Sequence, residues 1–215
     1  MLDVVDDWGR PVGVADRRTV HAEGLWHRVT HILLVADRGG TPTVVLQRRA
    51  ATKATFPGLL DLSATGHLEA GEAPVDGVRE LREELGIDIP TTALVPLGVR
   101  RIVDAIPGGV NRELVHVFLA RDDRPLAEYS PDDAEVDAVV DLPIDAGLDL
   151  VAGVVPRITC DSVPAGSGAV EPLDVTIDDL VPEPPDGGGG IAPGYWTVVL
   201  VMAGRFASGA PGLAI

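Results

Sequence analysis

The chain has 215 residues and a formal net charge of −16, and 46% of its residues are hydrophobic. This length and composition favour a globular protein of one domain, or one domain with an appendage, and exclude a disordered chain. The negative charge repels nucleic-acid backbones, so we expect no nucleic-acid polymer as a partner. Cys160 is the single cysteine, which excludes an intrachain disulfide and a cysteine metal cluster.

The first residues and the most apolar segment bear on the location of the protein. The acidic N-terminus lacks the basic-then-apolar order of a signal peptide. The apolar run 196–204 is about half of the roughly 20 residues that a membrane-spanning helix needs. We therefore expect a cytoplasmic, soluble protein without a membrane partner.

Strand-like and helix-like segments alternate along residues 1–153. Residues 3–27 form an acidic lead-in with a turn at 8–11, and β-rich runs predict strands at 29–35, 43–47 and 59–65. A helix over 79–85 follows. After it we expect strands at 94–103 and 113–120, a strand at 135–141 with one wet face, and a helix over 143–152.

The composition changes after Gly153. Residues 155–192 are rich in Pro, Gly, Ser and Asp and include the glycine run 187–190, so they predict a linker or long loop. Residues 195–207 predict a terminal helix that docks on the core. We therefore expect a domain over 1–153 and a loop-rich extension over 154–215 that packs on the same domain.

The helix over 79–85 carries acids on one face. Glu80, Glu83 and Glu84 stand at i, i+3 and i+4, while Leu81 and Leu85 form an adjoining apolar face. Like charges this close repel one another, and a hard divalent cation such as Mg²⁺, or Mn²⁺ in its place, offsets that repulsion. The glycine-rich loop before the helix adds, in order, Gly66, Glu69, Gly71 and Glu72.

Loop and helix together resemble the Nudix box, whose pattern is G-x5-E-x7-R-E-U-x-E-E-x-G-U, with U an aliphatic residue. Six residues separate Glu72 from Arg79 here, where the family has seven. We expect a shorter loop or a later helix start, with Asp76 as N-cap. The resemblance implies an α/β, mixed α+β fold of the Nudix type, an α/β/α sandwich with a central mixed sheet.

The resemblance also assigns roles to individual residues. Glu80, Glu83 and Glu84 would ligate Mg²⁺ or Mn²⁺ with a backbone carbonyl of Thr65 or Gly66, and Glu72 would support Arg79. A further carboxylate outside the box often completes such a site or serves as base, and we prefer Glu113 to Glu135. Glu83, Glu84 and Glu113 are thus the candidate catalytic residues. Three basic residues before the box are candidates to bind the substrate's phosphates: Arg48, Arg49 and Lys53.

Residues 2–150 also resemble the branch of Nudix proteins related to isopentenyl diphosphate isomerase. The isomerases have a catalytic cysteine where Thr65 stands, and a glutamate where Asn111 stands. Both differences argue against isomerase chemistry, and Cys160 lies too far along the chain to replace the cysteine. His27, His31 and His67 are similar to the isomerases' histidine metal site, but we expect them to be ordinary structural histidines.

We therefore predict a metal-dependent hydrolase that cleaves a nucleoside diphosphate derivative or a similar small-molecule diphosphate. A non-catalytic sensor that binds a nucleotide or a protein is the alternative, and an isomerase is a third reading. Residues 155–192 are open to three roles: capping the site, mediating a homodimer, or neither.

Overall fold

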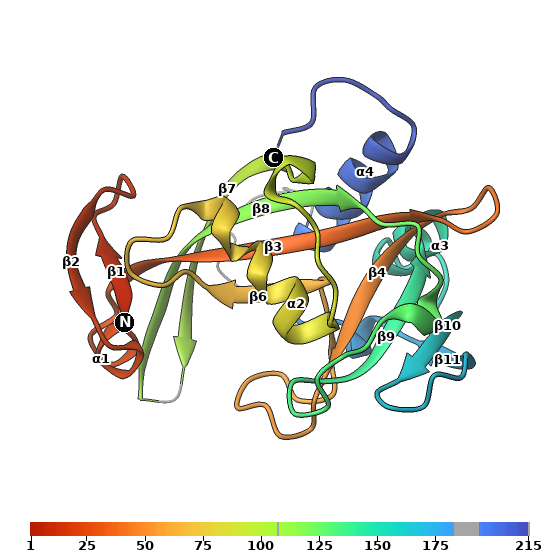
Figure 1. Ribbon diagram of the computed structural model, residues 1–215, viewed down its shortest axis with the longest axis horizontal. Helices are drawn as coiled ribbons and strands as arrows, with labels where there is room; N and C mark the ends of the chain where they lie inside the picture. Colours follow the sequence, from red (N-terminus) through yellow and green to blue (C-terminus); the bar gives the residue numbers. More distant parts are fainter. Residues whose placement is uncertain (107, 183–193, 215) are drawn as a thin grey trace.

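The computed structural model describes residues 1–106, 108–182 and 194–214 (Figure 1). One sheet of 11 strands dominates it. The strands are β1 (Leu2–Val5), β2 (Pro11–Ala15), β3 (Trp26–Asp37), β4 (Pro42–Arg49), β5 (Leu60–Asp61), β6 (Ala64–His67), β7 (Val95–Ile106), β8 (Gly109–Arg121), β9 (Val136–Pro143), β10 (Ile158–Pro164) and β11 (Glu171–Val175). The α-helices are α1 (Arg17–Glu23), α2 (Arg79–Leu85), α3 (Ile144–Val151) and α4 (Tyr195–Ala207), and the 3-10 helices are η1 (Pro74–Val78), η2 (Thr91–Ala93), η3 (Leu126–Glu128) and η4 (Ile177–Asp179).

Strand β3 is the hub of the sheet. It pairs antiparallel with β1, β4 and β6, and parallel with β8. The parallel pair within an otherwise antiparallel framework makes the sheet mixed, as predicted. Because β3 is 12 residues long, it extends from the lead-in at one end to the central core at the other.

Helices cover both faces of the sheet, which confirms the sandwich. Alternate residues of β3 point to opposite faces: Leu33 packs in the core cluster beneath α3 and α4, and Ile32 packs in the cluster beneath α2. Strand β6 follows the same rule through its register with β3. Thr65 pairs with His31 and Gly66 pairs with Thr30, so Thr65 and Gly66 face opposite sides.

The tail differs from its prediction as a linker or long loop. Strands β10 and β11 form a hairpin whose first strand pairs with β9, so residues 158–175 extend the sheet. The glycine run 187–190 lies outside the described residues. Strand β9 lies between β4 and β10, and all its residues except Asp137 and Pro143 are buried, so the predicted wet face is wrong.

Other segments follow their predictions closely. The segment 59–65 divides into β5 and β6, because β5 pairs with β4 while β6 pairs with β3. Helix α4 docks on the core as expected, through four buried residues: Trp196, Val199, Leu200 and Ala203. Across the described ranges, none of the helices has the length and apolarity to cross a membrane.

Candidate functional site

Helix α2 presents the predicted acidic face. Leu81 and Leu85 are fully buried in the core cluster beneath it, and this apolar stripe fixes which residues point outward. Gly86 ends the helix with a φ of 69°, and a Cβ at that position would lie 2.3 Å from the carbonyl oxygen of Ser130. The acidic helix and its glycine stop are therefore confirmed.

The shortened loop enters α2 through the 3-10 helix η1. The expectation that Asp76 caps the acidic helix is wrong: Val78 holds the N-cap position, and Asp76 Oδ2 accepts from the backbone N of Ala73 at 2.8 Å. The reason is that a 3-10 turn of Pro74–Val78 precedes the α-helix, so α2 begins only at Arg79. Gly77 lies in this turn, where a Cβ would meet Thr30 Cγ2 of β3 at 2.4 Å.

The loop keeps the contact that the resemblance implies. Arg79 Nε donates to Glu72 Oε1 at 2.9 Å, and this bond is the chief cause that raises the pKa of the Arg79 guanidinium. The other guanidinium nitrogens reach Glu80 Oε1 at 2.7 Å, Glu83 Oε2 at 2.9 Å and the carbonyl oxygen of His67 at 2.9 Å. Arg79 therefore ties the loop, the helix and strand β6 together.

Glu84 is the most deeply buried carboxylate of the helix, with a side chain only 4% exposed. Its Oε2 accepts from Gln47 Nε2 at 2.8 Å and from the backbone N of Thr65 at 3.1 Å. Desolvation nevertheless raises the pKa of Glu84 to about 8. A buried carboxylate of this kind favours either a proton or a cation beside it.

The side chains of Glu80 and Glu83 are more exposed than that of Glu84, and Glu83 is the most exposed of the three. Burial raises the pKa of Glu80 to about 7, although Arg79 opposes the shift. A Cβ on Gly66 would lie 2.0 Å from Glu80 Oε1, so the side chain touches the backbone of β6. The Glu83 side chain is 55% exposed and reaches toward solvent.

The formal charges around α2 do not balance. Four carboxylates, those of Glu72, Glu80, Glu83 and Glu84, face two basic side chains, Arg79 and Lys53. When all four carboxylates are ionised, four negative minus two positive charges leave an excess of two; without a cation nearby, the raised pKa values of Glu80 and Glu84 mean that protons reduce this excess. An oxygen-rich cluster with this excess has the donor chemistry that a hard divalent cation requires.

The predicted basic residues lie in different places. Lys53 Nζ is 3.9 Å from Glu84 Oε1 and also pairs with Glu135. Arg49 Nη1 bonds Asp61 Oδ2 at 3.2 Å, and the same Asp61 oxygen lies 3.4 Å from Thr65 Oγ1. Arg48 instead donates to the carbonyl oxygen of Gly58 at 3.1 Å. Lys53 therefore lies beside Glu84, and Arg49 shares Asp61 as a partner with Thr65. Arg48 instead contacts the loop that contains Gly58.

Glu113 lies on β8, opposite His27 in the parallel register with β3. Its Oε1 is 3.8 Å from His27 Nε2, and burial raises the pKa of the Glu113 carboxyl. The structure therefore places this carboxylate against a histidine. The other candidate, Glu135, is partly exposed beside Lys53.

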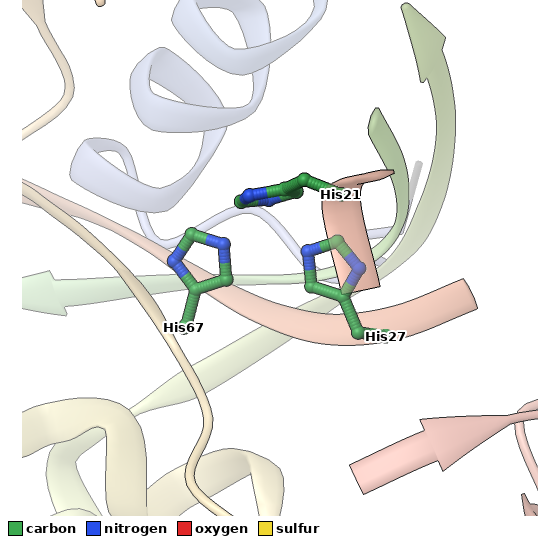
Figure 2. Close-up of side chains that lie close together, drawn as sticks. All are labelled: His21, His27 and His67. Carbon is green, nitrogen blue, oxygen red and sulfur yellow. The ribbon is translucent and has the colours of Figure 1, made fainter. Parts of the chain in front are cut away.

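Three histidines, His21, His27 and His67, converge as Figure 2 shows, and His27 is the one that lies against Glu113. A ligand nitrogen from each of His21, His27 and His67 lies within 4.8 Å of the others. The rings of His27 and His67 stack with centroids 5.0 Å apart, and His21 approaches both edge-on from α1. We call these three residues the histidine cluster.

Two ring nitrogens of the histidine cluster lack a hydrogen-bond partner among the described residues and are therefore available to bind a metal. His27 Nδ1 lies 3.1 Å from the carbonyl oxygen of Leu25, which favours the proton on Nδ1 and leaves a lone pair on Nε2. Within the described part of the chain, His27 Nε2 and His67 Nε2 are buried without a hydrogen-bond partner. Burial lowers the pKa of His27 to about 4, so the ring is neutral at pH 7. Neutral imidazoles suit Zn²⁺ and similar transition metals.

The resemblance groups His31 with His27 and His67, and the expectation that these three histidines are structural stays a prediction. His31 stands apart, with Nδ1 3.0 Å from the Tyr195 hydroxyl of α4, and His21 takes the third place. His21 comes close because α1 packs against β8, where a Cβ on Gly109 would lie 2.0 Å from the His21 carbonyl oxygen. Nothing in the periodicity of the sequence predicts this contact.

The comparisons with known proteins agree with the geometry. Residues 25–152 match the NUDIX domain family. An uncharacterized Nudix hydrolase from Clostridium acetobutylicum is 34% identical over 67% of this chain and 70% of its own length. An isopentenyl-diphosphate Delta-isomerase from Cutibacterium acnes is 34% identical over 63% of this chain and 70% of its own length.

Among solved structures, the fold is similar to that of a Deinococcus radiodurans protein, with a TM-score of 0.54 at 23% identity. That comparison covers 71% of this chain and 88% of the other. The family match extends over more than half of the chain and includes the loop, α2 and the strands around them. The chain belongs to the NUDIX domain family.

Proposed function

We propose that this protein is a metal-dependent hydrolase that cleaves the diphosphate linkage of a nucleoside diphosphate derivative or a similar organic diphosphate. The observation that carries the proposal is the excess of carboxylates over basic side chains around α2, with Glu72, Glu80, Glu83 and Glu84 against Arg79 and Lys53. Such an excess attracts a hard divalent cation, and the cation in turn attracts a diphosphate.

Each group of the site has a proposed part in this chemistry. Glu80, Glu83 and Glu84 would hold Mg²⁺ or Mn²⁺, together with a backbone carbonyl of Thr65 or Gly66. A cation held there would supply positive charge for the diphosphate and would lower the pKa of an attacking water.

The remaining groups bind the substrate and handle the proton. Lys53 and Arg49, which lie near Glu84 and Thr65, bind phosphate oxygens. The proton of the water passes to a carboxylate, for which Glu83, Glu84 and Glu113 are the candidates.

The histidine cluster favours a second candidate function. Three imidazoles with Glu113 would hold a transition metal, and a relative named as an isopentenyl-diphosphate isomerase is 34% identical. Isomerisation needs a proton donor and a proton acceptor on opposite sides of the alkene, and Thr65 replaces the cysteine that serves there in isomerases. We therefore rank hydrolysis first.

A non-catalytic sensor has less support than hydrolysis. The shorter loop between Glu72 and Arg79 would favour a sensor if it separated these two side chains, but their 2.9 Å contact is formed.

The test is a substrate panel in Mg²⁺, in Mn²⁺ and in chelator. The panel contains nucleoside diphosphate derivatives and isopentenyl diphosphate, with products identified by ³¹P NMR. Hydrolysis predicts cation-dependent cleavage of the diphosphate linkage. Conversion of isopentenyl diphosphate without phosphate release supports the isomerase, and tight ligand binding without turnover in any cation supports the sensor.

A further inference from the structure

The N-terminal strand β1 contacts the loop of residues 69–72, which carries Glu72, the partner of Arg79. The backbone N of Ala70 donates to the carbonyl oxygen of Met1 at 2.9 Å, and Leu2 forms a β-bridge with Glu69. Strand β1 precedes the segment that matches the NUDIX family, which begins at residue 25. Residues outside the family segment thus contact the loop that carries Glu72.

Two buried charged side chains join this strand to the loop. Asp3 Oδ2 accepts from the backbone N of Gly71 at 3.0 Å and from Arg28 Nη2 at 2.6 Å. The same Arg28 nitrogen donates to the carbonyl oxygen of Glu72 at 2.9 Å. The side chains of Asp3 and Arg28 are only 11% and 14% exposed, so water competes little for these bonds.

The bonds lead in a continuous path to the carboxylates of α2. Asp3 and Arg28 fix the backbone of residues 71 and 72, Glu72 bonds Arg79, and Arg79 bonds Glu80 and Glu83. Gly71 has a φ of 88°, a left-handed conformation that leaves the direction of the loop sensitive to what holds its N–H.

We propose that Asp3 and Arg28 are positioning residues for the carboxylate site, in that they set the direction of Glu72 and, through Arg79, of Glu80 and Glu83. This role rests on the proposed function. A buried ion pair is by itself weak support for stability, because desolvation offsets most of the attraction. Arg28 also leaves its Nε buried without a partner in the described part of the chain, which adds a cost. The geometry that the pair imposes on the loop accounts for its presence better than stability does.

The experiment measures Mn²⁺ affinity directly, by electron paramagnetic resonance of the free ion, in the full chain. The variants are Asp3→Asn, which keeps the shape of the side chain, and Arg28→Lys, which keeps the charge but not the guanidinium. Loss of a contact that orients metal ligands weakens metal binding by about 10- to 100-fold. We expect a shift of about 10-fold in each variant, and recovery of most activity at saturating Mn²⁺.

Asp6→Asn is the matched control. Asp6 lies in the same N-terminal segment, but among the described residues its carboxylate bonds within its own turn, to Trp8 and Arg10. We expect its Mn²⁺ affinity to equal that of the wild type. Melting temperatures without metal are measured in parallel for all variants, because a purely structural role would lower the melting temperature and leave the affinity unchanged.

The outcomes separate the two proposals. If the wild type binds Mn²⁺ more tightly than Glu83→Gln, and Asp3→Asn and Arg28→Lys both bind it as tightly as the wild type, the positioning role is wrong and the proposed function stands. If the wild type binds Mn²⁺ no better than Glu83→Gln, the proposed function fails at its metal site.

Discussion

Arg79 Nε lies 2.9 Å from Glu72 Oε1, across a loop that is one residue shorter than the family pattern. The contact is possible because the 3-10 helix η1 takes up the chain between the two residues, and because Gly77 lets that turn lie against Thr30 of β3. Arg79 then reaches two carboxylates of α2 from one side. The loop and the acidic helix therefore act as one unit.

This arrangement predicts that Arg79 cannot be replaced by lysine. A lysine keeps the charge but cannot bond Glu72, Glu80, Glu83 and the His67 carbonyl at once. We expect Arg79→Lys to lower kcat/KM by roughly 10- to 100-fold with little change in melting temperature. Arg82→Lys is the control, since Arg82 lies on the same helix with a side chain 71% exposed. Equal losses in the two variants would contradict the assigned role.

Gly66 is predicted to be required for the position of Glu80. A Cβ at residue 66 would lie 2.0 Å from Glu80 Oε1, so Gly66→Ala must displace that carboxylate. We expect the variant to fold and to bind Mn²⁺ about 10-fold more weakly, or worse. Gly13→Ala serves as control, because a Cβ at Gly13 meets nothing within 4 Å. Unchanged Mn²⁺ affinity in Gly66→Ala would show that Glu80 is not a ligand.

The histidine cluster is predicted to bind a transition metal independently of α2. Co²⁺ bound by imidazoles absorbs visible light, so titration of the wild type should give d–d bands and a higher melting temperature. His67→Gln should lose both effects. His116→Gln should keep them, because His116 lies outside the cluster. Identical spectra from the wild type and His67→Gln would remove the assignment.

His31 should make the fold sensitive to acid. Burial lowers the pKa of His31 from 6.5 to about 4, so between these values the unfolded chain binds more protons than the folded one. The contribution of His31 to stability therefore rises with pH from about 4 to about 6.5 and is fully present above that window. The contribution of this residue is at most about 3 kcal/mol.

The His31 contribution can be measured by urea unfolding at several pH values between 4 and 8. His31→Gln should show a smaller loss of unfolding free energy in acid than the wild type. An unchanged pH dependence would mean that His31 is accessible to protons in the folded state.

The sequence predicted those parts of the molecule that local chemistry decides. The acidic face of α2, its buried Leu81 and Leu85 and its glycine stop follow from helical periodicity within one short segment. The strands around β3 follow from runs of β-branched residues. The docking of α4 follows from the helical spacing of Trp196, Val199, Leu200 and Ala203.

The features that the sequence did not predict depend on contacts between distant segments. The sequence around β10 and β11 is rich in residues that favour turns. The two segments form strands because β10 pairs with the edge of β9 that β4 leaves open, and β11 pairs with β10. His21 joins His27 and His67 only because α1 packs on β8. Asp76 was a reasonable cap by residue type, but the 3-10 turn moved the start of the helix beyond it.

In the proposed function, the carboxylates of α2 carry the hydrolysis. Its most direct test is the rate of cation-dependent cleavage of the best panel substrate by the wild type, Glu83→Gln, Glu84→Gln and the surface control Glu171→Gln on β11. Loss of about 3 kcal/mol of charge stabilisation corresponds to about 100-fold in rate. We expect losses of at least that size in Glu83→Gln and Glu84→Gln, and wild-type activity in the control. Full activity in both Glu83→Gln and Glu84→Gln would contradict the account.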